Sequence, residues 1–356
     1  MSISSVKIVG SGLIGTSIGL ALKQKGVAVL MADSNLSVAS LAQSLVDPNQ
    51  SLEKNHVFDI VVISVPPSAF SSALAKEYEL HPLSTFVDTL SIKTKPQVEV
   101  ESFPGLIERF VGSHPMAGRE VSGAQSARGD LFVGRPWIIC PSAQVNEASE
   151  TLAKELIDLC GGVAITMQTD EHDQAMALVS HAPQVIASLM ASMLKIHNPQ
   201  WLDLIGQGFK DMTRIADSDA DLWREILSVN SINVSKVLAD FRNQLQLAEE
   251  GLSDSEYANS IIESGNSGRA LIPGKHGGSP RMYIYLHIII DDRAGQLAAI
   301  FNDCAIAEVN IEDVSIEHTP GQNTGLVTLS VLNANKAEHL RDFLISKGWK
   351  VHSTSK

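Results

Sequence analysis

The chain has 356 residues, enough for two or three domains that each bury a core of their own. Its 27 Lys and Arg residues against 40 Asp and Glu residues leave a net charge of −13, which excludes the positive field that non-specific nucleic-acid binding needs. With 44% hydrophobic and 19% charged residues, we expect a soluble chain without a membrane-spanning helix. The three cysteines lie too far apart for a zinc pattern or a redox pair, so we expect no metal site and a cytoplasmic location.

Short apolar runs alternate with helix-length segments in the first part of the chain. These runs are rich in Val and Ile, as in buried parallel strands that are joined by helices. The expected strands are residues 6–9, 28–32, 60–65, 86–88, 110–112, 137–140 and 163–167. We therefore predict an α/β fold with an N-terminal Rossmann domain over residues 1–165.

Residues 166–277 are expected to form an all-helical middle domain, because apolar side chains recur there at three-to-four spacing. The predicted helical stretches are residues 171–196, 201–215 and 221–250. Glycines and prolines are dense between residues 264 and 280, and such a density of helix breakers predicts a linker.

Residues 278–356 are expected to form a third domain of mixed structure. The predicted elements are strands at 282–290, 311–317, 325–332 and 349–352, with helices at 295–307 and 336–347. Their order, β-α-β-β-α-β, is that of a ferredoxin-like domain.

The first predicted strand is followed by Gly10-Ser11-Gly12-Leu13-Ile14-Gly15, which opens a helix-compatible segment. Glycines in such a loop allow a tight turn and a close approach of the backbone to a pyrophosphate, and the helix N-terminus supplies N–H donors. Ordinary turn glycines are the alternative. The position between a strand and a helix predicts a dinucleotide site, contacted by Gly10, Gly12, Leu13, Ile14 and Gly15.

Asp33 ends the second predicted strand, at the spacing from the glycines that this fingerprint has. A carboxylate there accepts hydrogen bonds from a ribose hydroxyl and repels a 2′-phosphate, which favours NAD over NADP; a helix cap is the alternative. Ser64, Val65 and Pro66 end the third predicted strand, at the sheet edge where such ligands bind, although a strand stopped by Pro66 explains them equally.

Two further polar side chains follow predicted strands, Ser91 after residues 86–88 and His114 after residues 110–112. Both are expected near the reacting end of a bound dinucleotide, because the carboxyl ends of parallel strands share one edge. In the helical region, Asp211 and Arg214 lie three residues apart on one helical face, where a surface ion pair is the alternative to a functional role.

These segments closely resemble the prephenate and arogenate dehydrogenase family of tyrosine biosynthesis. The resemblance rests, in family order, on the glycine fingerprint, the Ser91 segment, His-Pro-Met-Ala-Gly at 114–118, His172-Asp173 with Ser180-His181, and residues 211–223. Asp-Arg-Ala-Gly-Gln-Leu at 292–297 resembles an ACT regulatory domain. The resemblance implies a helical dimerisation and substrate domain at 166–277 and an ACT domain at 278–356.

The resemblance also implies roles for three residues in the oxidative decarboxylation of a ring alcohol. His114 matches the catalytic histidine that takes the hydroxyl proton as hydride leaves for NAD. Ser91 matches a serine that orients histidine and substrate, and Arg214 matches the arginine that grips a substrate carboxylate. The alternatives are a structural histidine, a serine that caps the helix beginning near Ile92, and the surface pair described above.

Further residues match pocket positions of the family, where fold support is the alternative role: Glu120, Asp211, His181, Gln184 and Trp223. The family's prephenate-using members often carry a histidine where this chain has Gln184, so the choice between prephenate and arogenate stays open, with prephenate preferred. His172 and His181 are nine residues apart, which does not make them adjacent metal ligands.

The resemblance implies a homodimer that interlocks through the middle helices. For the C-terminal domain, it implies that tyrosine binds at Asp292, Gly295 and Asn310, where plain turn chemistry is the alternative. The preferred function is an NAD-dependent prephenate dehydrogenase that makes 4-hydroxyphenylpyruvate. An arogenate dehydrogenase is the alternative enzyme, and a non-catalytic sensor of NAD and amino acids is the alternative of another class.

Overall fold

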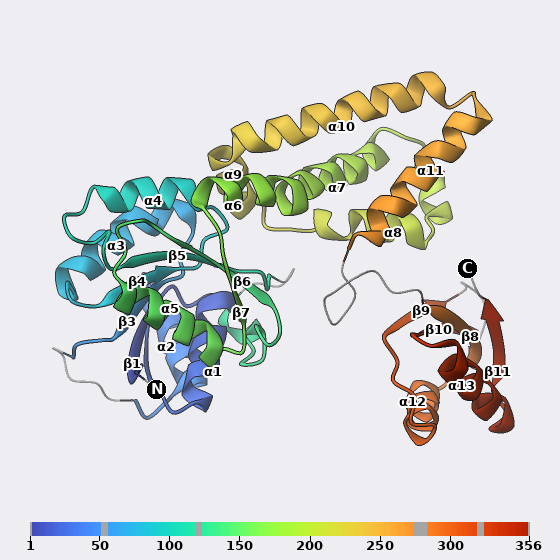
Figure 1. The fold of residues 1–356 in the computed structure, drawn as a ribbon, viewed down its shortest axis with the longest axis horizontal. Helices are drawn as coiled ribbons and strands as arrows, with labels where there is room; N and C mark the ends of the chain where they lie inside the picture. The colour runs from blue at the N-terminus through green and yellow to red at the C-terminus, as the bar shows by residue number, and fades with distance from the viewer. Residues whose placement is uncertain (1, 51–55, 119–122, 273–282, 319–323, 355–356) are drawn as a thin grey trace. The chain divides into compact units, whose positions relative to one another are not determined.

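The structure is a computed structural model that describes residues 2–50, 56–118, 123–272, 283–318 and 324–354 (Figure 1). The chain forms two compact units, Met1–Gln244 and Leu245–Lys356. The division into domains at residues 165 and 277 stays a prediction, since the units divide the chain within one helix instead.

A seven-stranded sheet lies at the centre of the N-terminal unit. Its strands are β1 (Ser5–Val9), β2 (Ala28–Ala32), β3 (Ile60–Ile63), β4 (Thr85–Asp88), β5 (Phe110–Pro115), β6 (Pro136–Pro141) and β7 (Val163–Thr166). Their order in space is β2-β1-β3-β4-β5-β6-β7. The chain moves outward from β1 to β2 and then returns past β1 to β3, so the order of strands reverses beside β1, where dinucleotides bind in such sheets.

The prediction of an all-parallel sheet is wrong at one pair. The strands β1 to β5 run parallel, but β6 pairs antiparallel with β5, placing His114 opposite Ile138. A parallel pair needs a crossover, usually a helix, whereas an antiparallel pair needs only a reversal of the chain. Between β5 and β6 the described residues contain only the short 3₁₀ turn η2 (Ala124–Ser126), which is consistent with such a reversal.

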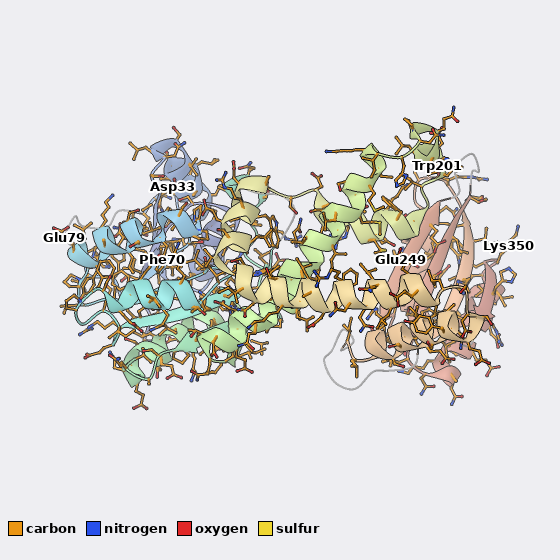
Figure 2. All side chains as sticks on the ribbon, turned by 90° about the horizontal axis from the view of Figure 1, so that it is seen from above. Asp33, Phe70, Glu79, Trp201, Glu249 and Lys350 are labelled. Atoms are coloured by element: carbon orange, nitrogen blue, oxygen red, sulfur yellow. The ribbon has the colours of Figure 1, made fainter. Side chains whose placement is uncertain are left out.

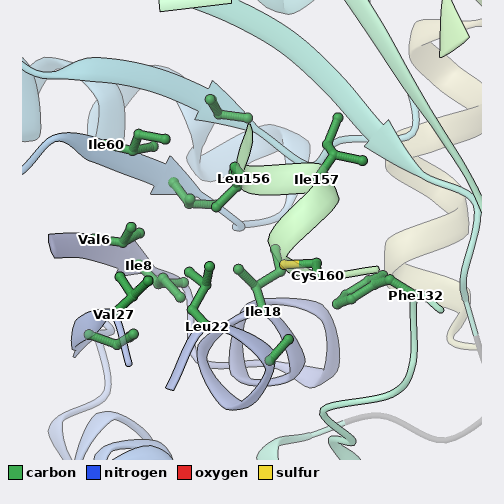
Figure 3. Close-up of a cluster of buried hydrophobic side chains, with 14 of the residues drawn as sticks. Val6, Ile8, Ile18, Leu22, Val27, Ile60, Phe132, Leu156, Ile157 and Cys160 are labelled. Atoms are coloured by element: carbon green, nitrogen blue, oxygen red, sulfur yellow. The ribbon is translucent and has the colours of Figure 1, made fainter. Parts of the chain in front are cut away.

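Helices cover both faces of the sheet. They are α1 (Leu13–Gln24), α2 (Leu36–Val46), the 3₁₀ turn η1 (Pro67–Ala69), α3 (Phe70–Leu80), α4 (Thr94–Glu101) and α5 (Glu147–Leu159). Alternate strand residues point to opposite faces, so Ile8 packs with α1, α2 and α5 (Figure 3), whereas Val61 packs with α3 and α4. The amphipathic α3 shows the two environments, with Phe70 buried and Glu79 at the surface (Figure 2).

The middle of the chain is helical, as predicted, but more broken. Its elements are α6 (Thr169–Met176), the π turn η3 (Ala177–His181), α7 (Ala182–Ser192), η4 (Met193–Lys195), η5 (Pro199–Leu204), α8 (Gln207–Thr213), η6 (Arg214–Ala216), α9 (Ala220–Val229), α10 (Ser231–Gly251) and α11 (Ser255–Ala270). The predicted linker starts too early, because Gly265 and Gly268 lie inside α11. A helix tolerates isolated glycines at about 1 kcal/mol each.

The π turn changes which residues of the first long helix share a face. At 3.6 residues per turn, two residues nine apart lie about 180° from each other around an α-helix. A π turn accommodates about one extra residue, which brings the angle to about 80°. His172 and His181 both end up buried, although they are nine residues apart.

The continuous helical run Thr169–Lys195 is long and apolar enough, by length and composition, to cross a membrane. We expected no such stretch. The run nevertheless buries His172, Asp173 and His181 against polar partners, and Met176 packs on Ile138 of the sheet. Such buried polar contacts are typical of a core helix in a folded protein, which passes the same test of length and hydropathy.

The C-terminal unit holds a second, antiparallel sheet. Its elements are β8 (Ile284–Asp291), α12 (Gln296–Ile306), β9 (Asp313–His318), β10 (Thr324–Val331), α13 (Ala334–Ser346) and β11 (Lys350–Thr354). The strands lie in the order β11-β8-β10-β9. Side chains of α12 and α13, such as Ile300 and Leu340, form one core with Ile288 and Val327 of the sheet.

Candidate functional site

The glycine loop between β1 and α1 folds so that two of its residues have no room for a side chain. Gly10 has a φ of +102°, and a Cβ atom there would lie 2.0 Å from the carbonyl oxygen of Ser64. A Cβ atom on Gly15 would lie 2.1 Å from the carbonyl oxygen of Gly10. Gly12 differs, because its Cβ atom would meet nothing within 4 Å. The loop therefore needs two glycines for its own packing and offers open space at the third.

The open space lies at the N-terminus of α1, whose N-cap is Gly12 and which has no side-chain cap. The first N–H groups of a helix lack partners within it, so those of Leu13 and Ile14 suit a phosphate. Beside the loop, Asp33 accepts a hydrogen bond from the Ser11 N–H at 2.8 Å. The predicted dinucleotide residues thus lie together, and their chemistry fits a pyrophosphate next to a ribose.

Ser64 joins this group from the neighbouring strand. Its N–H donates to the Val9 carbonyl at 2.7 Å, and its hydroxyl accepts a hydrogen bond from the Thr89 hydroxyl at 2.9 Å. Val65 is half-buried, while Pro66 is exposed at the N-cap of η1. Thr89 follows β4 and was not among the predicted residues, although its position after a strand marks it as a candidate.

His114 lies near the carboxyl end of β5 and is half-buried. Its Nδ1 atom lies 2.9 Å from Nε2 of His172, which α6 supplies, and the two rings meet edge to face. Nδ1 of His172 in turn lies 2.8 Å from Oδ1 of Asp173. The same carboxylate accepts the N–H groups of Lys93, at 2.8 Å, and Thr94, at 2.9 Å. A continuous hydrogen-bonded chain therefore runs from His114 into the protein.

The electrostatics of this chain keep both histidines neutral. Burial lowers the pKa of His114 well below its usual value, and the neighbouring His172 and Lys93 lower it further. Burial also lowers the pKa of His172. Burial raises the pKa of Asp173, but the hydrogen bonds from His172 and from Thr94 and Lys93 outweigh it and bring the value to about 2. At neutral pH the chain ends in a carboxylate.

A buried ion pair lies under the histidines. Lys93 contacts Asp88 and donates a second hydrogen bond to the Ser113 carbonyl at 2.6 Å. Asp88 accepts the Ser113 N–H at 2.6 Å, and Trp137 donates to the Ser113 hydroxyl at 3.0 Å. Both charged groups of this layer have partners, and their hydrogen bonds to Ser113 hold the end of β5 that carries His114.

His181 lies in a second polar cluster with two residues of the later helices. The Asn230 side chain donates to the Asp173 carbonyl at 2.7 Å and lies 3.0 Å from Nδ1 of His181. The Trp223 ring meets the His181 ring edge to face, with centroids 5.9 Å apart. Burial lowers the pKa of His181 to about 4. The structure thus brings together His181 and Trp223, which were predicted to line one pocket, and adds Asn230.

The segment that carries Arg214 is held by Gln184. This amide is buried on α7 and donates to the carbonyl oxygen of Ile215 at 2.8 Å. Arg214 is exposed at the start of η6, and the exposed Asp211 accepts a hydrogen bond from Gln207 at 2.8 Å. Gln184 therefore contacts the backbone beside Arg214, which gives it a part in placing that guanidinium.

Two other predicted residues have a weaker place in this geometry. Ser91 is half-buried in the turn before α4, which begins at Thr94 rather than near Ile92, and its side chain bonds to no other described residue. Within the described chain it is His172, not Ser91, that bonds to His114. Glu120 lies outside the described residues.

The predicted regulatory residues are exposed in the C-terminal unit. Asp292 follows β8, and Gly295 is the N-cap of α12 with a φ of +90°. Asn310 donates to the Glu312 carboxylate at 2.7 Å. Gly295 has the backbone conformation that favours glycine, which turn chemistry alone explains. Among the described residues of the whole chain, no group of three His, Cys, Asp or Glu side chains is arranged to hold a metal ion.

Comparison with known proteins assigns the chain to a family. Residues 18–166 match the model of the prephenate dehydrogenase nucleotide-binding domain, and residues 168–263 match that of the prephenate dehydrogenase dimerization domain. Together the two matches cover more than half of the chain. The chain belongs to the prephenate dehydrogenase family. The predicted resemblance to this family is confirmed over these residues.

Relatives of the family match over most of their length. A probable prephenate dehydrogenase of Streptomyces niveus, NovF, is 29% identical over 97% of this chain and 99% of its own. A prephenate dehydrogenase of Lactococcus lactis is 27% identical over 89% and 92%. The crystal structure of a prephenate dehydrogenase from A. aeolicus, in complex with hydroxyphenyl propionate and NAD+, has a TM-score of 0.69 at 27% identity and covers 76% of this chain and 99% of that chain.

Proposed function

We propose that this chain catalyses the NAD-dependent oxidative decarboxylation of prephenate to 4-hydroxyphenylpyruvate. The observation that carries the proposal is His114, a neutral, half-buried histidine near the carboxyl end of β5, at the same edge of the sheet as the glycine loop after β1, in a prephenate dehydrogenase fold. The predicted activity class is confirmed by the family match, and NAD is supported by the A. aeolicus relative that binds NAD+ and hydroxyphenyl propionate.

The residues described above divide the reaction between them. The N-terminus of α1 would hold NAD, which would supply the acceptor for the hydride on the ring carbon that bears the hydroxyl group. His114 takes the hydroxyl proton as that hydride leaves. Loss of CO₂ from the ring then makes the ring aromatic, and the proton on His114 returns to the same oxygen to give the phenol. Arg214 is the cation that we assign to a substrate carboxylate, because a guanidinium presents two parallel donors.

Arogenate is the alternative substrate, differing from prephenate by an amino group in place of the side-chain keto group. Gln184 bears on this choice, but its NH₂ group already donates to the backbone of η6. A neutral amide that is committed to the protein favours neither an ammonium nor a keto group strongly, so prephenate is preferred on the family match.

A matrix of initial rates with both substrates and both cofactors tests the proposal. Purified protein is mixed with prephenate or arogenate and with NAD or NADP, and absorbance of the reduced cofactor is followed. We expect the highest kcat/KM with prephenate and NAD, because Asp33 repels a 2′-phosphate. A faster rate with arogenate would make this an arogenate dehydrogenase, and no reduced cofactor in any combination would favour the non-catalytic sensor.

We also propose a homodimer that forms through the middle helices, within the cytoplasm. The matched dimerization domain supports it. So do large apolar side chains that stay exposed on these helices and in the turns between them, among them Leu189, Ile196 and Trp201, the last visible in Figure 2. A soluble protein rarely leaves several such side chains uncovered on one set of helices. The three cysteines are all free and buried, which fits a reducing compartment.

For the C-terminal unit we propose an ACT domain that binds tyrosine, the pathway product, and lowers activity. The β-α-β-β-α-β order and the turn at Gly295 support this assignment. Gly295→Val places a β-branched residue at positive φ, and we expect it to weaken tyrosine inhibition while activity without tyrosine stays the same. Equal inhibition of the variant and the unchanged protein by tyrosine would refute the proposed site.

A further inference from the structure

The hydrogen bonds of His114 define where its proton must be. Asp173 has a pKa of about 2, so at neutral pH its oxygens only accept hydrogen bonds. Nδ1 of His172 lies 2.8 Å from one of these oxygens and must therefore carry a proton. A neutral imidazole carries one proton only, so Nε2 of His172 is an acceptor. The atom 2.9 Å from it, Nδ1 of His114, must then donate.

This direction of donation leaves one nitrogen of His114 free to act. With Nδ1 protonated, Nε2 of the neutral His114 holds a lone pair and no proton, which is the form that a general base needs. We propose that His172 and Asp173 are positioning residues that hold His114 in its Nδ1-protonated tautomer, so that Nε2 accepts the substrate proton. The inference rests on the proposed function, and it names two residues of the catalytic machinery besides His114 and Ser91.

The same chain stabilises the charge that forms when His114 takes up a proton. The charged or titratable groups facing His114 are His172 and Asp173 from α6, His181 from η3, and Lys93 with its partner Asp88 from the layer below. Asp173 is the anion among them that attracts the imidazolium without being committed to a lysine. His172 lies between Asp173 and His114 and links them by hydrogen bonds. The stabilisation by the Asp173 carboxylate increases as the substrate proton moves onto His114 and its ring becomes positively charged.

Asp173 has a structural role as well, and the test must separate the two. Its carboxylate holds the N–H groups of Lys93 and Thr94, at the start of α4. Loss of these bonds lowers stability whether or not His114 is affected. The test therefore needs a readout that a loss of stability alone would not change. Two are available: the acidic limb of the pH profile of kcat/KM, and the tautomer of the His114 ring.

The variants are Asp173→Asn, His172→Gln and His172→Leu, with Asp170→Asn as the matched control. Asp170 lies in the first turn of the same helix, three residues before Asp173, is exposed, and loses the same charge in its variant. His172→Gln keeps an amide oxygen that can accept from His114, and His172→Leu removes the acceptor. Each full-length protein is assayed with prephenate and NAD across the pH range, and its melting temperature is measured.

We expect Asp173→Asn to lower kcat at least tenfold, with an upper limit of about 10² to 10⁴, the contribution of a general base. Its acidic limb should move to lower pH, because removing an anion destabilises protonated His114. His172→Gln should retain more of kcat than His172→Leu at a similar KM. The proposal is overturned if Asp173→Asn matches Asp170→Asn in both kcat and limb, or if His172→Gln and His172→Leu are equal.

A second measurement does not depend on turnover. In protein with ¹⁵N-labelled histidines, the His114 signals are assigned by their loss in His114→Asn, and we expect protonated Nδ1 and unprotonated Nε2 at neutral pH. The reverse tautomer, or an exchanging mixture, contradicts the proposal. If the unchanged protein forms no NADH from prephenate, the proposed function fails, while this spectrum still decides whether the hydrogen-bonded chain has the stated direction.

Discussion

His114 concentrates the proton chemistry of the site in one side chain. His114→Asn removes the base while keeping a polar group of similar size, so we expect kcat with prephenate to fall by about 10² to 10⁴. NAD binding should change little, because the glycine loop and Asp33 lie on other strands. Steady-state rates and a direct titration with NAD measure the two effects. A variant with unchanged kcat would show that another group takes the proton.

The pH dependence follows from the direction of the His114 pKa shift. The unprotonated ring is the active form, so activity falls as pH drops through the pKa of this group. Burial, His172 and Lys93 all lower that pKa below the usual value of about 6.5. We therefore expect kcat/KM for prephenate to be level near neutral pH and to decline only below about pH 6.5. An acidic limb centred above neutrality would contradict the described surroundings of His114.

Gln184 offers a test of how Arg214 is placed. Gln184→Leu removes the donor to the Ile215 carbonyl, and one such bond contributes about 0.5–1.5 kcal/mol. We expect KM for prephenate to rise about 2- to 10-fold, the equivalent of that energy, with a smaller change in kcat. Gln174→Leu, an exposed change on α6, is the control. Equal KM values for the two variants would mean that η6 holds its position without Gln184.

At this scale, the sequence predicted the residues that belong to short local patterns. The glycine loop with Gly10 and Gly15 comes after the first strand, and Asp33 comes after the second strand at the spacing usual for this fingerprint. The structure brings these residues together. Asn230 falls inside the helical stretch predicted at residues 221–250, although in the structure it is the C-cap of α9, and its importance depends on meeting His181 from a segment 49 residues away. No local pattern marks such a residue, because the contact exists only after the helices pack.

At the scale of the elements, two substitutions in the glycine loop are expected to affect different properties, one the stability of the protein and the other its binding of NAD. Gly15→Ala forces a Cβ atom to within 2.1 Å of the Gly10 carbonyl oxygen, so we expect a loss of about 1–3 kcal/mol in stability and a lower melting temperature. Gly12→Ala meets no protein atom within 4 Å, so stability should hold while the methyl group intrudes on the phosphate site and weakens NAD binding. Thermal melts and NAD titrations distinguish them, and equal melting temperatures would contradict this geometry.

The elements themselves were well predicted where their pattern is strong. The seven strands of the first sheet were expected from apolar runs, and each is present. The direction of β6 was not, since an apolar run is the same in both directions and only the connection before it determines its sense. The π turn was also missed, because it replaces one α-helical turn without a breaker such as proline or glycine inside it.

For the whole molecule, the proposed dimer predicts which surfaces tolerate a charge. Leu189→Asp, on α7, and Ile196→Asp, in the turn after η4, place carboxylates in the region that we assign to the interface, where these side chains are 60% and 78% exposed in the single chain. We expect either change to shift the protein to monomers in sedimentation equilibrium. Leu83→Asp, at a 67% exposed position of the nucleotide-binding part, is the control and should leave the dimer intact. A monomeric unchanged protein would remove the proposal.

The net charge of −13 restricts how this molecule can capture its ligands, because prephenate and NAD are also negatively charged. The long-range field of an acidic protein repels them, so attraction must come from local donors such as the helix N-terminus at Gly12 and the guanidinium of Arg214. Because the repulsion is screened by salt, moderate ionic strength should speed capture rather than slow it.

The π turn at Ala177–His181 also has a consequence for how the gene can gain or lose a codon in this helix. A helix between two fixed ends can absorb one added residue by widening a single turn, so one in-frame codon is enough to create such a turn. Loss of one codon between the two histidines would leave them eight residues apart, which in a regular α-helix is again about 80°, so the same side of the helix would carry both without a π turn. Among homologous genes, the number of codons between these two histidines therefore indicates whether the helix that joins them contains a π turn.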